Sequence, residues 1–430
     1  MLRKTVQSVL IIILILLNMG STYSAEEVQQ LTLREAQTRL SLPEAQEIAL
    51  KQNPEVREAY LEIKKSESHL RSIIAQRYPQ AFAAIFGGQQ MTGNDWKDFV
   101  VVPGVYQPVT QQYRLGLMTR EARIQVEVSR QRLRLAKQRT IANIRINYLS
   151  MLALQSSITS LQENLDFLGE LERYVASEVR KGAALEVDAL LVRARVARAD
   201  FELAHAKDDL TTLMQTLNRM LGRAPRSEMV LVDQAPSPIV EGDEDTAIDG
   251  AFAKRPEMSE IKLNIRRYNL ESRIQLAGYI PDVGIGILGA FSNNFDIGIP
   301  RNFASVGFLG TWTPWDSGTR MHLSREQQSA MRQEGVRLND LANGVSIDVD
   351  KARRAVRVSE KEAKSGELAE LSSKEELRVI HRRFTSGAAL LKDVLEAHSA
   401  YMKAIADNVK AKTDIATAQA QLDEALGRDF

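Results

Sequence analysis

Two long stretches of the chain carry apolar residues at helical spacing with no proline to interrupt them. From Tyr113 to Lys181 apolar residues recur three and four positions apart, as at Leu154, Ile158, Leu161, Leu165 and Leu168. This spacing predicts an amphipathic helix with a coiled-coil bias. The stretch from Gly318 to Ser386 is proline-free too. Each has roughly 69 residues, so each predicted helix is about 100 Å long, which indicates an elongated molecule.

Four shorter segments have the same texture: residues 41–79, 185–221, 247–280 and 390–428. Two of them stacked end to end match one long helix in length. We pair 185–221 with 247–280, and 41–79 with 390–428. The sequence therefore predicts a wall of helices about 100 Å long.

The segments 80–112 and 282–315 look different. They contain all three tryptophans and few charges, and Val283, Ile285 and Ile287 alternate with small residues. Alternation of this kind predicts strands, and each segment divides into two strands of about ten residues around a polar loop, at 93–98 or 293–301. Strands of this length with aromatic flanks suit a tilted membrane strand, with the polar loops outside the cell. The alternative is a buried soluble hairpin, and Pro103 weakens the strand prediction for 99–110 because proline donates no ladder hydrogen bond.

The chain is internally duplicated. Pro54-Glu55 is matched by Pro256-Glu257, 202 positions later. Gly182-Ala183-Ala184-Leu185 is matched by Gly387-Ala388-Ala389-Leu390, and Leu221-Gly222-Arg223 by Leu426-Gly427-Arg428, both 205 positions later. The division is therefore a first repeat at 25–222, a linker at 223–245 that contains prolines and acids and is expected to be irregular, and a second repeat at 246–430. The turn of each predicted long hairpin lies near residue 182 or 387.

Residues 1–24 have the pattern of a secretory signal peptide. Arg3 and Lys4 precede an apolar run from Val9 to Leu17, and small or polar residues follow, with the cut placed after Ser24. The alternative is a membrane anchor, but the run is about half as long as a spanning helix requires. Later runs are also too short, so a membrane crossing would have to use strands.

Composition excludes several kinds of chemistry. The chain has 56 Lys plus Arg against 55 Asp plus Glu, so no bulk field attracts nucleic acid. It has no cysteine, and none of its five histidines is spaced to share a metal ion. The G-x-G-x-x-G at 284–289 lacks the strand before it and the helix after it that a dinucleotide site needs. No catalytic constellation is present, so we expect no enzyme, no cofactor and no metal.

The opening residues 40–55, with Leu40-Ser41-Leu42-Pro43-Glu44 and Asn53-Pro54-Glu55, resemble the signature of TolC-like outer membrane efflux proteins. Pro314-Trp315-Asp316-Ser317-Gly318 is similar to the strand-to-helix turn of that family, and the two Gly-Ala-Ala-Leu segments are similar to its hairpin tips. The resemblance runs from about residue 40 to the end. It implies a mainly α protein with a small β part: an internally duplicated long-helix α-barrel, in which four strands per chain contribute to a trimeric, twelve-stranded transmembrane β-barrel.

The resemblance also implies a function. The protein would be the outer-membrane channel, or exit duct, of a tripartite efflux or type I secretion system, passively passing what an inner-membrane pump delivers through a periplasmic adaptor protein. It would be a homotrimer in outer membrane lipid with a long periplasmic extension. The alternative is a periplasmic coiled-coil scaffold without a pore, which needs the same helices but not the two charge-poor aromatic segments.

Candidate site residues follow from the same resemblance. The acids that ring the periplasmic aperture in the family correspond to Asp393 and Glu396, with Asp188 as the counterpart in the first repeat. The alternative is that these acids are ordinary solvated carboxylates that only stabilise the start of a helix. The tips that contact the adaptor correspond to Gly182, Ala183 and Ala184, and to Gly387, Ala388 and Ala389. Some family members latch the closed state with an arginine where this chain has Ala389.

Overall fold

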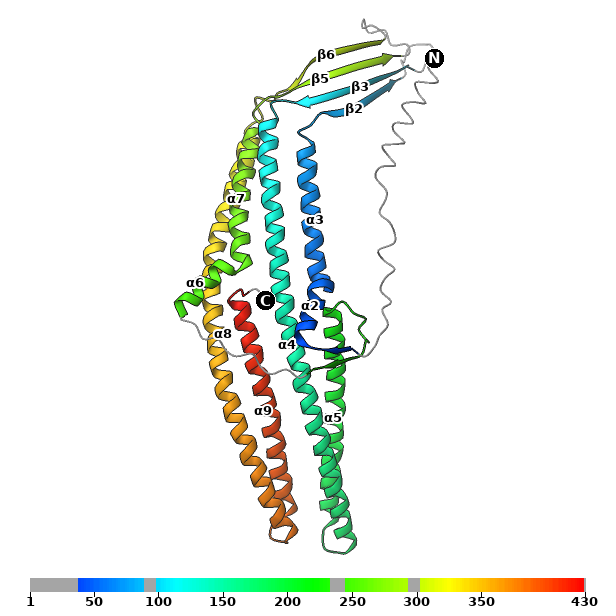
Figure 1. Cartoon of the computed structure of the whole chain (residues 1–430), viewed down its shortest axis with the longest axis vertical. Coiled ribbons are helices and arrows are strands. Elements are labelled where there is room, and N and C mark those ends of the chain that lie inside the picture. The colour runs from blue at the N-terminus through cyan, green and yellow to red at the C-terminus, as the bar shows by residue number, and fades with distance from the viewer. Residues whose placement is uncertain (1–37, 89–97, 233–243, 293–301, 429–430) are drawn as a thin grey trace.

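The computed structural model describes residues 38–88, 98–232, 244–292 and 302–428 (Figure 1). The predicted signal peptide at 1–24 and most of the two polar strand loops, 93–97 and 293–301, lie outside the described residues. The described chain is an elongated rod. A four-stranded sheet lies at one end, two helix hairpins end at the other, and short elements lie around the middle.

Helices make up most of the rod. They are α2 (Leu42–Gln52), α3 (Pro54–Ala75), α4 (Gln112–Arg180), α5 (Glu186–Met220), α6 (Glu244–Lys254), α7 (Pro256–Ala277), α8 (Thr319–Thr385) and α9 (Leu391–Ala425). The two long helices, α4 with 69 residues and α8 with 67, run nearly the whole length (Figure 1). Among the described residues, no helix combines the length and the apolar content that a bilayer span requires.

The short helices stack differently from our prediction. The side-chain amide of Asn53, at the start of α3, donates to the carbonyl of Met220 at the end of α5, 2.8 Å away. Arg255, at the start of α7, donates in the same way to Ala425 at the end of α9, also at 2.8 Å. The stacks are therefore α3 on α5 and α7 on α9, and the predicted pairing was wrong. The reason is connectivity: α3 and α5 are the neighbours of α4 along the chain, and both lie against it.

The helices form one layer in which the second repeat follows the first. Near the sheet the order is α3, α4, α7, α8, and near the tips it is α5, α4, α9, α8. Helix α4 thus has helices on both of its sides, whereas α8 has them on one side.

The sheet has the same order as the helices beside it. Its strands, all antiparallel to their neighbours, are β2 (Gln80–Gly88), β3 (Asp98–Pro108), β5 (Asp282–Ser292) and β6 (Asn302–Thr311), in the order β2-β3-β5-β6. Pro103 lies inside β3 opposite Ala83 of β2, and the pairing of β3 with β5 skips Val102 and Pro103. The sheet accommodates the proline by leaving a gap in one ladder, because proline has no N–H to donate there.

The linker is more ordered than predicted. Its residues Met229–Leu231 form strand β4, which pairs in parallel with β1 (Thr38–Leu40), and α6 begins at Glu244. The wholly buried ring of Tyr148 holds this pair against α4, with its hydroxyl 2.8 Å from the carbonyl oxygen of Leu40 and 2.7 Å from that of Val232. Met229 and Leu231 join the apolar core around Tyr148, which fixes the waist of the rod.

Candidate functional site: the hairpin tips

The two hairpin tips, residues 181–185 and 386–390, turn in the same way. Gly182 has φ 72° and Gly387 has φ 77°, as expected for glycines that end a helix in the left-handed region. In the first tip the N–H of Ala183 donates to the carbonyl of Glu178, at 2.9 Å. The N–H of Ala388 donates to Arg383 in the second, at 2.7 Å. Both are Schellman turns, in which the glycine reverses the chain and satisfies carbonyls at the helix end.

Asp188 and Asp393 are the third residues of α5 and α9. Asp188 Oδ2 accepts the N–H of Leu185 at 3.2 Å, and Asp393 Oδ2 accepts the N–H of Leu390 at 3.0 Å. Each carboxylate therefore accepts a hydrogen bond from a backbone N–H at its helix start. Its negative charge also interacts favourably with the positive end of the helix dipole. This explains the spacing of six residues between the glycine and the aspartate: three residues reach the first capping position, and three more reach the acid that bonds back to it.

The second tip carries an acid that the first lacks. Glu396 lies one turn after Asp393, is 65% exposed and lies 3.5 Å from Lys392 Nζ. The position equivalent to Glu396 in α5 is Leu191. The three predicted aperture acids thus divide between two tips, with a pair on one and a single carboxylate on the other.

The tip surface is apolar at its turn. Ala183 and Ala388 are exposed, and Ala184 and Ala389 are half-buried. Leu185 and Leu390, which we did not select from the sequence, are 71% and 69% exposed. Each occupies the N-cap of the following helix, where Ser, Thr, Asp or Asn is favoured. Leucine at the N-cap in both repeats was the signal in the sequence that could have identified them.

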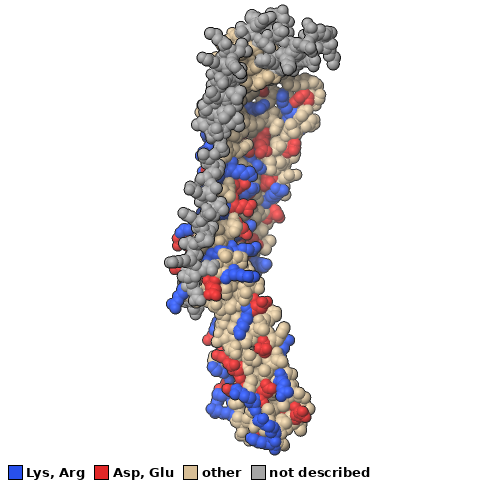
Figure 2. Space-filling view, turned by 90° about the vertical axis from the view of Figure 1, so that its right-hand side faces the viewer, with Lys and Arg blue, Asp and Glu red and all other residues tan. Residues whose placement is uncertain are grey.

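Basic side chains surround this apolar turn. Arg180, Lys181, Arg382 and Arg383 are all exposed, and Figure 2 shows Lys and Arg side chains at the tip end of the molecule. Lys181 pairs with Glu178 at 2.8 Å, a hydrogen bond that raises the pKa of Lys181.

Above the tips, a buried histidine joins the two hairpins. His398 of α9 is 7% exposed, and its Nε2 lies 2.6 Å from Asn164 Oδ1 of α4. Its ring stacks on Phe167 with centroids 4.2 Å apart. Burial lowers the pKa of His398 from 6.5 to about 4, so the ring is neutral at neutral pH.

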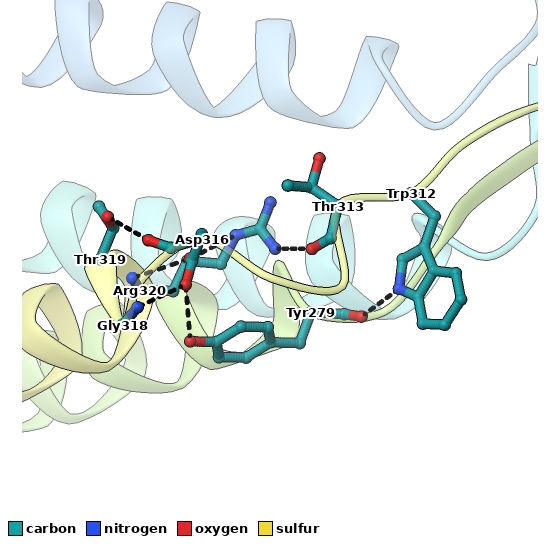
Figure 3. Close-up of polar contacts among 7 residues, drawn as sticks. All are labelled: Tyr279, Trp312, Thr313, Asp316, Gly318, Thr319 and Arg320. Carbon is teal, nitrogen blue, oxygen red and sulfur yellow. Dashed lines mark hydrogen bonds and ion pairs between the residues drawn. The ribbon is translucent and has the colours of Figure 1, made fainter.

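At the opposite end, the strand-to-helix turn of the second repeat is built around Asp316 (Figure 3). Its carboxylate accepts the N–H groups of Gly318 and Arg320, both at 3.1 Å, and the hydroxyl of Tyr279 at 3.2 Å. Desolvation opposes ionisation, but these hydrogen bonds outweigh it and hold the pKa of Asp316 below its usual value. Trp312 Nε1 donates to the Tyr279 carbonyl at 3.2 Å, which ties β6 to the end of α7.

The G-x-G-x-x-G at 284–289 lies within β5. A side chain at Gly284 would meet the Tyr106 ring at 2.3 Å, so the glycine makes room for a neighbouring strand. In the described part of the chain, no three His, Cys, Asp or Glu residues are grouped to hold a metal ion.

Family comparison identifies this architecture. Residues 45–223 match the family described as outer membrane efflux protein. The first repeat is therefore similar to that of an outer membrane efflux protein. This match confirms, for the first repeat, the resemblance inferred from the sequence motifs. No curated protein matches the chain closely in sequence.

Solved structures show a similar fold over at least nine-tenths of the chain. The Campylobacter jejuni CmeC outer membrane channel aligns with a TM-score of 0.78 at 15% identity, covering 95% of this chain and 93% of that one. A membrane protein from Pseudomonas aeruginosa gives 0.76 at 19% identity, covering 90% of both chains. The Vibrio cholerae outer membrane protein VceC gives 0.73 at 14%, covering 90% and 96%. These values confirm the predicted fold class, a duplicated wall of long helices with a small sheet.

Proposed function

We propose that this protein is the outer-membrane exit duct of a tripartite efflux or type I secretion system, which passively passes substrates delivered by an inner-membrane pump. The observation that carries the proposal is the shared order of sheet and helices. The strands β2-β3-β5-β6 continue into the helices α3-α4-α7-α8, and in the described part of the chain both layers end on edges without a neighbouring strand or helix. Such a layer has the form of one section of a tube wall that continues from strands into helices.

Closure of the tube requires further copies of the chain. Four strands are too few, because the smallest membrane barrels have eight. The family resemblance favours three copies and hence twelve strands. Apolar side chains on the sheet face solvent in the single chain, with Ile85 at 72%, Val306 at 71% and Phe308 at 81% exposed. Outer membrane lipid would cover them in our proposal, and the helices would extend through the periplasm.

The aperture is assigned to the tips. Three copies of Asp393 and Glu396, with Asp188 nearby, would surround one axis. Like charges brought together disfavour each other's ionisation and attract cations. We therefore expect a narrow, cation-selective pore that multivalent cations block from the tip side.

Recordings in planar bilayers test this assignment. The double variant Asp393→Ala, Glu396→Ala should lose cation selectivity and multivalent block while the trimer stays intact. If both properties persist, the aperture lies elsewhere. If the acids serve only their helix starts, the variant loses a little stability and the pore is unchanged. A pore-free scaffold would give neither conductance nor a heat-resistant trimer in the outer-membrane fraction.

The tips are also assigned as the docking surface for a periplasmic adaptor. Exposed Ala183, Leu185, Ala388 and Leu390 present an apolar surface inside a basic rim. The double variant Leu185→Ser, Leu390→Ser distinguishes an effect on adaptor docking from an effect on folding. Serine is the better N-cap, so α5 and α9 should be slightly stabilised while export falls. Normal export with the more stable helices would remove these side chains from the docking surface. A bulky charged residue in place of Ala183 and Ala388 should abolish export from an intact trimer.

A further inference from the structure

A pocket of about 410 Å³ lies at the waist of the rod, where α2, α3 and α4 meet. Three basic residues line it, one from each helix: Lys51 of α2, Arg57 of α3 and Lys137 of α4. Tyr60 of α3, which is 50% exposed, lies beside them. The remaining lining is mostly apolar, with Leu50, Val56 and Leu133, and none of the described lining residues is acidic. A concave site of this size, with charges of one sign and apolar surface, suits a small organic ligand.

The charges of this pocket are only partly compensated within the chain. Lys51 pairs with Glu47 at 2.6 Å, but both side chains are more than two-thirds exposed, and such a surface pair contributes little to stability. The charged groups of Arg57 and Lys137 have no hydrogen bond or ion pair to any described residue. Two of the three cations are therefore available to an anion from outside the chain.

The duplication supplies an internal comparison for these residues. Positions of the second repeat follow those of α2 and α3 by 202 residues and those of α4 by 205. The equivalents of the three cations are all uncharged: Ala253, Ser259 and Ala342. Lys262 stands where the first repeat has Tyr60. The helices of the second repeat pack without these charges and without this ring, so the helical wall does not require them for folding.

A basic stripe on α4 ends at this pocket. Arg123, Arg130 and Lys137 are exposed and seven residues apart, so they lie on nearly the same face of the helix at intervals of about 10 Å. Arg130 also pairs with Glu127 at 2.6 Å. The equivalents of the stripe on α8 are again uncharged: Gln328, Gly335 and Ala342. The stripe therefore belongs to the first repeat alone, as the cations of the pocket do.

The same asymmetry holds for the whole part of each long helix between the sheet and the waist. Residues 114–145 of α4 include nine basic and two acidic residues. The equivalent residues 319–350 of α8 include four basic and five acidic ones. A surface with an excess of one sign of charge raises the local concentration of counter-ions. This part of α4 should therefore draw anions toward the pocket.

We propose that the pocket between α2, α3 and α4 is a binding site for an organic anion. Arg57 and Lys137 hold its phosphate or carboxylate group, and Lys51 is the third cation of the site. Guanidinium and ammonium groups form charge-assisted hydrogen bonds with such anions, which are stronger than those between neutral groups. An apolar or ring-shaped part of the ligand packs on Tyr60. The site is separate from the aperture and docking surface assigned to the tips, and binding there does not depend on the proposed duct.

Equilibrium dialysis of 1-naphthyl phosphate against the full chain in lipid nanodiscs tests the site. Arg57→Gln and Lys137→Gln should each weaken binding about fivefold, as for the loss of one exposed ion pair. The triple variant Lys51→Ala, Arg57→Ser, Lys137→Ala introduces the residues of the second repeat. It should weaken binding on the order of a hundredfold if the three losses add.

The matched control removes three exposed cations of the second repeat. The variant Lys262→Ala, Arg266→Ala, Arg325→Ala changes the net charge by the same amount. Its affinity should stay within about twofold of the wild type, because exposed charges farther away than a Debye length are screened by salt. Wild-type affinity in the triple variant of the pocket, or an equal loss in the control, would overturn the site. The single variants decide the matter if the triple variant unfolds at a lower temperature than the wild type.

Tyr60→Ser distinguishes an organic anion from a simple ion. The substitution should weaken binding of 1-naphthyl phosphate about tenfold, because an apolar contact is lost, and should leave competition by inorganic phosphate unchanged. An equal loss for both ligands, or no loss for either, would contradict the contact with the ring.

Competition identifies the carrier of the anionic group. Galacturonate and polygalacturonate present the same carboxylate, free or on a polymer. Displacement of 1-naphthyl phosphate by free galacturonate supports a soluble ligand. Displacement by the polymer alone, at equal carboxylate concentration, supports a polymer that follows the basic stripe, and Arg123→Gln should then weaken it. Displacement by neither would contradict recognition of carboxylates.

Discussion

The two repeats have the same backbone conformation at their hairpin tips. They have different backbone conformations at the turns where the strands lead into the long helices α4 and α8. Both tips use a left-handed glycine, a Schellman turn and an aspartate that bonds back to a leucine N–H. At the other end, α8 begins after Ser317 and Gly318, with φ 55° and 83°, around the Asp316 carboxylate. Helix α4 begins after Gln111 in an ordinary helical conformation.

The first repeat holds its junction with amides instead of a carboxylate. Gln112 accepts from Arg77 Nε at 3.0 Å and donates to the Arg77 carbonyl at 2.8 Å, and Gln107 donates to the same carbonyl at 3.0 Å. The strand-to-helix junctions of the two repeats are therefore held by different side-chain contacts, whereas the two hairpin tips are held by the same ones. If the tips form the docking surface and the aperture, as we propose, function adds a constraint there that the strand-to-helix junctions do not share.

The largest expected difference between the repeats is a loss of folding stability on acidification, caused by His398 in the second repeat. The equivalent position in the first repeat is Arg193, which is 64% exposed. The folded pKa of His398, about 4, lies below its usual 6.5, so the unfolded chain binds the proton more readily. The stabilisation is complete above pH 6.5 and is lost as pH falls toward 4, by up to about 3 kcal/mol per chain.

Thermal unfolding followed between pH 7.5 and 4 measures this loss. His398→Gln, which cannot titrate, should flatten the pH dependence over that window, and the exposed His381→Gln should leave it as in the wild type. An unchanged slope in His398→Gln would mean that other groups dominate the acid response.

Asp316→Ala is expected to have the next largest effect. The substitution removes the acceptor of two backbone N–H groups and the Tyr279 hydroxyl, so we expect a loss of about 2 kcal/mol. The matched control is Gln111→Ala at the equivalent position, whose side chain caps nothing, with an expected change within about 0.5 kcal/mol. Unfolding midpoints of the two variants give the comparison directly, and equal losses would refute the distinction between the junctions.

The tip glycines should respond equally. Gly182→Ala and Gly387→Ala force a side chain into the left-handed region, at a cost of about 1 kcal/mol each. Nothing lies within 4 Å of the added Cβ at either position, so the cost is conformational. Gly169→Ala inside α4 also meets open space and should stabilise the helix by roughly 0.5–1 kcal/mol. Amide exchange around residues 169, 182 and 387 measures the three variants, and a clear difference between the two tips would show that their likeness is only geometrical.

Local patterns in the sequence predicted the long helices, the strand segments and the positions of the two tip turns. These features depend on spacing within a few turns, as at Gly182 and Gly387. The stacking of α3 on α5 depends on the bond from Asn53 to Met220, 167 residues apart, and no periodicity reports it. The burial of His398 depends likewise on Asn164 and Phe167 in the other repeat.

The candidate site also has a part that local sequence indicates and a part that only the folded backbone shows. The family resemblance selected Asp188 and Asp393, but their bonds to Leu185 and Leu390 appear only when the backbone of the turn is known. Pro103 weakened the strand prediction for 99–110, yet β3 forms, because the sheet leaves its β3–β5 ladder unpaired only at Val102 and Pro103. Sequence reasoning was reliable where one turn or one strand decides the structure, and unreliable where distant segments do.

Replacing each capping aspartate with asparagine has the smallest expected effect on stability. It also compares the two hairpin tips directly. Asp188→Asn and Asp393→Asn keep an oxygen that can accept the leucine N–H but remove the charge that favours the helix start. The expected loss is about 0.3–1 kcal/mol at each tip, equal in the two repeats because the two helix starts have the same geometry. Amide exchange over residues 185–189 and 390–394 measures it.

The pore should not treat the two variants equally. Asp393 is accompanied by Glu396, whereas the corresponding neighbour of Asp188 is Leu191. If the aperture is formed mainly at the second tip, Asp393→Asn reduces cation selectivity and Asp188→Asn changes it little, although both lose the same stability. Equal loss of selectivity would place both tips around the aperture, and no change in either would leave these carboxylates as caps alone. Because stability is matched between the variants, any difference in conductance reports the position of the charge in the assembled pore.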